Sequence, residues 1–186
     1  MHAPVAADAD GGAAVADAAQ PRAFAETLAW LRQRVPSDAS PTLLHSDYKL
    51  DNIILDPVTL DPVAVIDWDM GTRGDPLWDL AVLLSYWSEP GDPPCMHRLR
   101  QMPTAERPAF WLRRDALAHY QRVTDRDTSD FRFYRVLSVF RSAIVFLQLF
   151  DRWRRDPASN RRFAGFDTLG REMLDFAFEI TRGRAD

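Results

Sequence analysis

The chain has 186 residues, of which 46% are hydrophobic and 27% charged, and its formal net charge is -4. This length and composition are those of a soluble globular domain with a sizeable core, and the mild acidity argues against nucleic acid or an anionic membrane as a partner. The only cysteine, Cys95, cannot form an internal disulfide, and neither a signal peptide nor a membrane-spanning stretch is visible, so we expect a cytoplasmic protein.

The first 20 residues are rich in Ala, Gly and Asp and poor in large apolar side chains, which predicts a disordered tail. Residues 21–186 are predicted to form the folded domain. A helix is expected to begin near Pro21, because proline suits a first helical turn, and to end at Pro36. Its apolar face would consist of residues spaced by three and four positions, namely Phe24, Leu28, Leu31 and Val35.

Three short runs of β-branched and apolar residues come next and predict three short strands. They span residues 42–44, 53–55 and 63–68. The segment 56–62 between the last two runs contains two Asp-Pro pairs, which are typical of turns. We therefore expect the last two strands to form a hairpin.

From residue 77 onward the pattern becomes helical. Residues 77–87 are apolar almost all round, which predicts a buried helix. Residues 89–95 predict a loop, and residues 108–123 predict an amphipathic helix.

Two further helices complete the expected fold. A long helix would take Asp127 or Thr128 as its N-terminal cap and run to about residue 153. A last helix would cover residues 163–180, where large apolar side chains recur every three or four positions. The expected fold class is therefore α+β and mostly helical, with a small β-hairpin region between the helices.

Polar residues gather at the edges of the short strands, as the motif H-x-D-x-K-x-x-N over residues 45–52 and a carboxylate after the last strand. Phosphoryl transfer from ATP needs a carboxylate to take the proton of the attacking hydroxyl, oxygen ligands for Mg²⁺, and a cation near the transferring group. Asp47 would be the base, and Lys49 would reach the γ-phosphate. Asn52 and Asp67 would bind Mg²⁺ through side-chain oxygens.

The segments HSDYKLDN and IDWD resemble the catalytic and metal loops of protein kinases. They are more similar still to the aminoglycoside phosphotransferase-like family, whose loops read H-G-D-x-x-x-x-N and I-D-W. The run GDPLWDLAVLLSYW resembles especially the branch found alone in bacteria or fused to acyl-CoA dehydrogenases. The similarity covers roughly residues 22–182. It implies the C-terminal lobe of the protein kinase-like fold and a kinase that uses ATP and Mg²⁺ to phosphorylate a hydroxyl group on a small molecule.

The same resemblance implies the roles already given to the base, the two metal ligands and Lys49, and it adds others. Ile54 and Ile66 match the apolar positions that form the floor of the adenine pocket, so Lys49, Ile54 and Ile66 are the expected nucleotide-binding residues. His45 matches a position that packs the catalytic loop. Asp79 matches a buried carboxylate that hydrogen-bonds the backbone of that loop, since a buried carboxylate is costly without such bonds.

The chain departs from the family in two respects. Position 46 is Ser where the family usually has Gly, and this residue would be strained if the loop requires positive φ there. The family's N-terminal lobe brings a phosphate-covering loop and a strand lysine. About 40 residues precede His45, they contain no G-x-G-x-x-G, and Lys49 is the only lysine. We therefore expect a C-terminal lobe alone, as a fragment, a truncated gene model or a split enzyme, with a separate N-lobe chain or self-association as the expected partnership.

Two other interpretations stay open. A catalytically inactive kinase-like lobe would act as a binding or interaction module. A plain helical interaction domain would scatter Asp47, Asn52 and Asp67 in space. Asp69 is either a second metal carboxylate or a residue that only fixes the loop, and Asp75 is expected to cap the buried helix. The sequence does not identify the acceptor.

Overall fold

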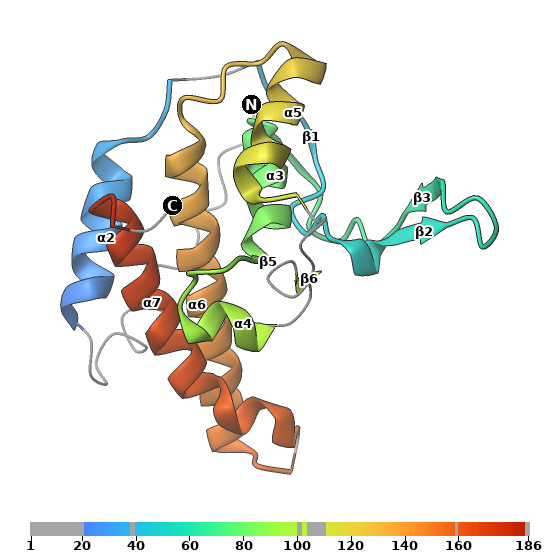
Figure 1. The fold of residues 1–186 in the computed structure, drawn as a ribbon. Coiled ribbons are helices and arrows are strands. Elements are labelled where there is room, and N and C mark those ends of the chain that lie inside the picture. Colours follow the sequence, from blue (N-terminus) through green and yellow to red (C-terminus); the bar gives the residue numbers. More distant parts are fainter. Residues whose placement is uncertain (1–20, 38–39, 100–101, 104–110, 159, 185–186) are drawn as a thin grey trace, which may run out of the picture. The chain divides into compact units, whose positions relative to one another are not determined.

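The computed structural model describes residues 21–37, 40–99, 102–103, 111–158 and 160–184. The predicted tail of residues 1–20 lies outside them. The chain divides into two compact units. We call Met1–Gln33 with Val139–Asp186 the helical unit, and Arg34–Ser138 the loop unit. Helices dominate both and the strands are short (Figure 1), so the predicted mostly helical α+β class is confirmed.

The helical unit consists of α2 (Pro21–Gln33), most of α6 (Phe131–Arg155), the 3-10 helix η3 (Arg161–Gly165) and α7 (Phe166–Thr181). The predicted last helix is thus divided into η3 and α7. The buried residues of α7 recur every three or four positions, as an amphipathic helix requires. A side chain at Gly170 would place its Cβ 2.7 Å from Leu147 Cγ, so this glycine allows α7 to pack closely on α6.

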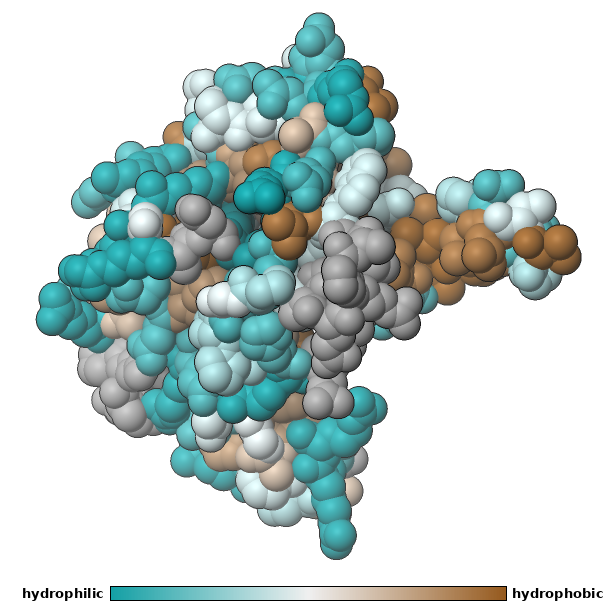
Figure 2. Space-filling model, in the orientation of Figure 1, coloured by the Kyte–Doolittle hydropathy of each residue, from teal (hydrophilic) through white to brown (hydrophobic). Residues whose placement is uncertain are grey.

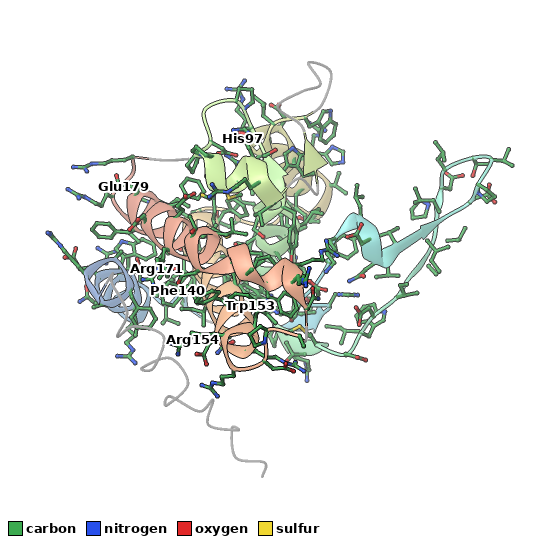
Figure 3. The ribbon with its side chains drawn as sticks, turned by 90° about the horizontal axis from the view of Figure 1, so that it is seen from below. His97, Phe140, Trp153, Arg154, Arg171 and Glu179 are labelled. Carbon is green, nitrogen blue, oxygen red and sulfur yellow. The ribbon has the colours of Figure 1, made fainter. Side chains whose placement is uncertain are left out.

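The first helix buries the predicted face only in part: Leu31 is buried and Phe24 and Leu28 are half-buried, but Ala23 and Thr27 are buried too. Ala23, Thr27 and Leu31 are 7%, 0% and 5% exposed, whereas Val35 is 69% exposed because α2 ends at Gln33. Phe24 does take part in the packing, because its ring centroid lies 5.2 Å from that of Phe140 on α6. Figure 3 labels Phe140 beside the blue helix α2. The prediction for Val35 was wrong because the helix stops before Pro36, whose ring disfavours helical geometry at the residue before it.

The long helix α6 begins at Phe131, later than predicted. The Asp127 carboxylate accepts a hydrogen bond from the Ser129 N–H (2.9 Å), so it caps the preceding turn instead of the helix. By length and composition alone α6 is able to cross a membrane. We interpret it as a core helix, because its buried side chains recur at helical spacing, and they include Val136, Val139, Phe140, Ala143 and Leu147.

In the loop unit, β1 (Thr42–Leu44) pairs antiparallel with β4 (Thr72–Gly74), and β2 (Ile53–Leu55) pairs antiparallel with β3 (Pro62–Val65). The predicted hairpin is therefore confirmed. Its second strand ends at Val65, so residues 66–68 do not continue it as predicted. The strand β4 was not predicted, because Thr-Arg-Gly has no apolar alternation.

The predicted buried helix is α3 (Leu77–Ser85), which ends two residues early because Trp87 belongs to the short strand β5 (Trp87–Ser88). A buried cluster of Ala81, Leu84, Trp87 and Phe131 forms the core around it. The remaining elements are α4 (Pro94–Leu99), β6 (Met102–Pro103), which pairs in parallel with β5, and α5 (Arg113–Thr124). Residues 94–95 were predicted as loop but open α4, and residues 108–110 of the predicted helix lie outside the described chain.

Candidate active site

The catalytic loop, residues 45–52, connects β1 to β2 and ends in the 3-10 turn η1 (Leu50–Asn52). The first turn of α3 holds its backbone. The N–H groups of His45 and Ser46 donate to the two carboxylate oxygens of Asp79, and each donor–acceptor distance is 2.7 Å. The prediction that Asp79 bonds the loop backbone is confirmed, although the carboxylate is half-buried instead of buried. Bonds to an ionised acceptor are short and strong, so this contact fixes the start of the loop.

His45 connects the catalytic loop to the end of strand β3. Its side chain is 2% exposed. Nδ1 accepts a hydrogen bond from the Asp47 N–H (3.3 Å), and Nε2 lies 2.7 Å from the Ile66 carbonyl oxygen. The proton must therefore reside on Nε2, which donates to that carbonyl. Through this histidine the loop that carries Asp47 is tied to the residue before Asp67.

Asp47, Lys49 and Asn52 form one hydrogen-bonded cluster. Lys49 Nζ donates to Asp47 Oδ2 (2.8 Å), and Asn52 Nδ2 donates to the Asp47 carbonyl oxygen (2.9 Å) and to Oδ2 (3.2 Å). The side chains of Asp47 and Lys49 are 18% and 22% exposed. Within the described residues Oδ1 of Asp47 accepts no hydrogen bond, so this oxygen is open to a hydroxyl group of a ligand.

The charge of Lys49 is held by its surroundings. Burial by itself lowers the pKa of Lys49, but the hydrogen bond to Asp47 and the negative potential of Tyr86, Asp47 and Asp51 outweigh it and raise that pKa above its usual value. Lys49 Nζ also lies 5.7 Å from the ring centroid of Tyr86. Tyr86 was not predicted to belong to the site, although it lies seven residues after Asp79 and hence on the same face of α3.

Asn52 also connects the catalytic loop to the segment that carries Asp67, the other predicted metal ligand. Its backbone carbonyl accepts from the Ile66 N–H (2.9 Å), which extends the β2–β3 ladder and places Asp67 next in the chain. Asp67 is exposed, and its carboxylate makes no hydrogen bond or ion pair within the described residues. Because both hydrogen bonds that the Asn52 amide makes with described residues come from Nδ2, Oδ1 stays available as an oxygen ligand.

This donor set fits Mg²⁺, which takes one or two carboxylates and completes its octahedron with phosphate oxygens and water. Among the described residues no three His, Cys, Asp or Glu side chains form a metal cage on their own. The proximity of Asp47, Asn52 and the segment that carries Asp67 does not match the scatter that a plain helical domain predicts.

Two neighbouring carboxylates have different surroundings. Asp75 accepts from the Leu77 N–H at the start of α3 (2.9 Å), as predicted for a helix cap, and its other oxygen accepts from Tyr134 O–H (2.9 Å). Burial and this bond raise the pKa of Tyr134. Asp69 is exposed and makes no side-chain bond within the described part of the chain, so it does not fix the loop in that way.

The apolar residues predicted to contact adenine lie on the hairpin side of the site. Ile54 pairs with Ala64, and Ile66 lies two residues further, so all three occupy one face of the ladder. Ile54 and Ile66 are 46% and 44% exposed. Figure 2 shows hydrophobic residues gathered along this hairpin. An exposed apolar face suits a flat apolar ligand, and the adenine contact stays a prediction.

Two non-glycine residues of the site have left-handed backbones. Ser46 has φ of 64° and Asp67 has φ of 65°. The catalytic loop therefore does require positive φ at the position where the family usually has glycine. Such residues are held by surrounding contacts at a cost, and they cluster at functional sites.

Comparisons with known proteins agree with this geometry. A model of the phosphotransferase enzyme family matches residues 3–111. Acyl-CoA dehydrogenase family member 11 of Mus musculus is 34% identical over 117 residues, which are 61% of this chain and 15% of that protein. Family member 10 of the same organism is 24% identical over 158 residues, 85% of this chain and 15% of that protein. The predicted relation to proteins that carry this domain beside an acyl-CoA dehydrogenase is thereby confirmed.

A solved structure from Ralstonia eutropha, described as a candidate aminoglycoside phosphotransferase, has the same fold with a TM-score of 0.71 and 23% identity. The match covers 94% of this chain and 53% of that one. The chain thus spans about half the length of this structure and 15% of the first curated relatives it matches. The predicted protein kinase-like fold is confirmed.

Proposed function

Because the chain belongs to the phosphotransferase enzyme family, we propose that its site transfers the γ-phosphoryl group of ATP to a hydroxyl group of a small molecule, with Mg²⁺. One observation carries the proposal: Asp47, Lys49 and Asn52 form a single hydrogen-bonded cluster beside the segment of Asp67, and Asp79 holds the loop that bears them. These are the residue types that phosphoryl transfer needs, at one place.

In the proposed reaction the acceptor hydroxyl oxygen bonds to the γ-phosphorus, and the bond from that phosphorus to the bridging oxygen breaks to release ADP. The hydroxyl proton passes to Asp47, whose Oδ1 is open to it. Lys49 lies 2.8 Å from the other oxygen of Asp47 and is placed to turn toward the γ-phosphate. When bound, Mg²⁺ would neutralise charge on the phosphates, and Asp67 and Asn52 would hold it.

The test is a calorimetric titration of the folded chain with ATP, with and without Mg²⁺. We expect binding that depends on Mg²⁺. Asp67→Ala is expected to abolish it, because the exposed carboxylate is the only charged ligand in the proposed metal set. Asp47→Ala is expected to keep nucleotide affinity and lose turnover, because Asp47 faces the acceptor. Equal affinities in wild type and Asp67→Ala would remove the metal assignment.

Asp61→Ala is the matched control, since it removes a carboxylate from the same hairpin at an exposed position. Its nucleotide affinity is expected to equal that of the wild type. A folded chain that binds no nucleotide under any condition would instead favour the second candidate, a kinase-like lobe that acts as a binding module. One observation supports that candidate: the hairpin exposes large apolar residues, including Val58 at 87%, Leu60 at 67% and Val63 at 61%.

A further inference from the structure

We propose that Tyr86 is a positioning residue for Lys49: its ring keeps the ε-ammonium group at the catalytic loop when that group leaves Asp47 for the phosphate. The inference rests on the proposed function for its consequence. Its geometric basis is the position of Lys49 Nζ, 2.8 Å from Asp47 Oδ2 and 5.7 Å from the Tyr86 ring centroid.

The helix α3 supports the catalytic loop at two points. Asp79 in its first turn binds the backbone of His45 and Ser46. Tyr86 follows its last residue, still with helical dihedral angles (φ -90°, ψ -3°), and its N–H donates to the Leu83 carbonyl. Seven residues are two helical turns, so Asp79 and Tyr86 project from one face. One rigid element therefore places both the loop backbone and the side chain that Lys49 contacts.

The two partners of Lys49 differ in what they require of it. The bond to Asp47 is a directed hydrogen bond from one of the three N–H donors of the ammonium group, and it breaks if that group swings away from Asp47 to reach a phosphate. Attraction to an aromatic face is less directional, because it arises from the ring quadrupole. Lysine has a flexible four-carbon stem, so without a second contact the released ammonium would be free to turn into solvent. Tyr86 supplies that second contact.

The test uses the fact that Lys49 is the only lysine in the chain. Protein labelled with ¹⁵N-lysine gives one side-chain ammonium resonance, whose position and hydrogen exchange report on Lys49 directly. Tyr86→Phe keeps the ring and is expected to leave this resonance unchanged at neutral pH. Tyr86→Leu removes the ring and is expected to move the resonance toward that of a free lysine, with faster exchange. Tyr86→Met replaces the leucine variant if that one does not fold.

Phe178→Leu is the matched control, because Phe178 of α7 also lies under a cation, with Arg182 5.4 Å from its ring centroid. It is expected to leave the Lys49 resonance where it is, whereas Asp47→Asn should move it. If Asp47→Asn moves the resonance and the ring-free Tyr86 variants do not, the inference is overturned.

The consequence is measured as affinity for Mg-ATP. Loss of one cation–π contact is expected to weaken binding about 2- to 5-fold in Tyr86→Leu, with Tyr86→Phe equal to wild type. Equal affinity in all three would overturn the positioning role. If the wild type binds no nucleotide, the proposed function fails, while the lysine resonance still decides whether Tyr86 positions Lys49.

Discussion

The catalytic loop and the metal segment, residues 66–70, are both parts of the candidate site, but the chain holds them differently. In the loop, His45 and Asn52 are 2% and 6% exposed, and Asp79 binds the backbone. In the metal segment Ile66, Trp68 and Met70 are 44%, 45% and 50% exposed. The proposed base and lysine are therefore organised in advance, whereas the carboxylate of Asp67, the proposed metal ligand, makes no bond within the described residues and can turn toward a ligand.

The largest effect is expected when the carboxylate that anchors the catalytic loop is removed. Asp79→Ala leaves two backbone N–H groups without their charged acceptor. Each such bond contributes about 1.5–3 kcal/mol, so we expect the free energy of unfolding to fall by about 3–6 kcal/mol. Urea denaturation followed by tryptophan fluorescence measures it.

The matched control lies in the metal segment. Asp69→Ala removes an exposed carboxylate that makes no bond within the described residues, and surface changes of that kind stay within about 0.5 kcal/mol. A loss in Asp79→Ala no larger than that of Asp69→Ala would mean that the loop is not anchored by α3.

A smaller effect on stability is expected at Asp75, the other carboxylate at the start of α3. Asp75 accepts from the Leu77 N–H and from Tyr134 O–H, so Tyr134→Phe deletes one hydrogen bond at the base of α3. We expect a loss of about 1 kcal/mol at pH 7, measured by urea denaturation.

The free energy of unfolding is expected to depend on pH through the pKa of Tyr134. Burial and Asp75 raise the folded-state pKa of Tyr134 above its unfolded value of about 10. The folded state thus keeps the proton that the unfolded state loses, and the stability is present below pH 10 and declines as pH rises above it. Tyr134→Phe should decline less steeply. The decline that remains includes the contributions of Tyr120 and Lys49, whose pKa values are also raised. Parallel curves would contradict the assignment to Tyr134.

Much of the catalytic loop and its surroundings could be predicted from the sequence, because the residues that define them are close together in the chain. The proposed base, lysine and amide fall within six residues, and the hairpin is marked by two apolar runs around Asp-Pro turns. The cap at Asp75 follows the same logic, since a capping residue acts on the N–H groups directly after it.

The rest depends on tertiary contacts that no local pattern encodes. The strand β4 forms because its backbone pairs with that of β1. Tyr86 contacts Lys49 because the end of α3 lies beside the catalytic loop. Val35 was placed on a buried face by its spacing, yet α2 ends before it. The exposure of residues 66–70 also has no local signal, since Ile, Trp and Met suit a core equally well.

The smallest expected effect concerns Ser46, the residue of the catalytic loop with positive φ, whose counterpart in the metal segment is Asp67. Ser46 and Asp67 have nearly equal φ values, 64° and 65°, but only Ser46 is fixed by a bond from its N–H to Asp79. A non-glycine residue held at this φ is strained, and the bonds of the anchored loop must offset that strain. Comparing Ser46→Gly with Ser46→Ala isolates it, since both variants lose the hydroxyl. We expect the glycine variant to be more stable than the alanine variant by about 0.5–1 kcal/mol in urea denaturation. Equal stabilities would mean that the loop relaxes at residue 46 and carries no strain there, which would contradict the rigid loop that the contacts of Asp79 imply.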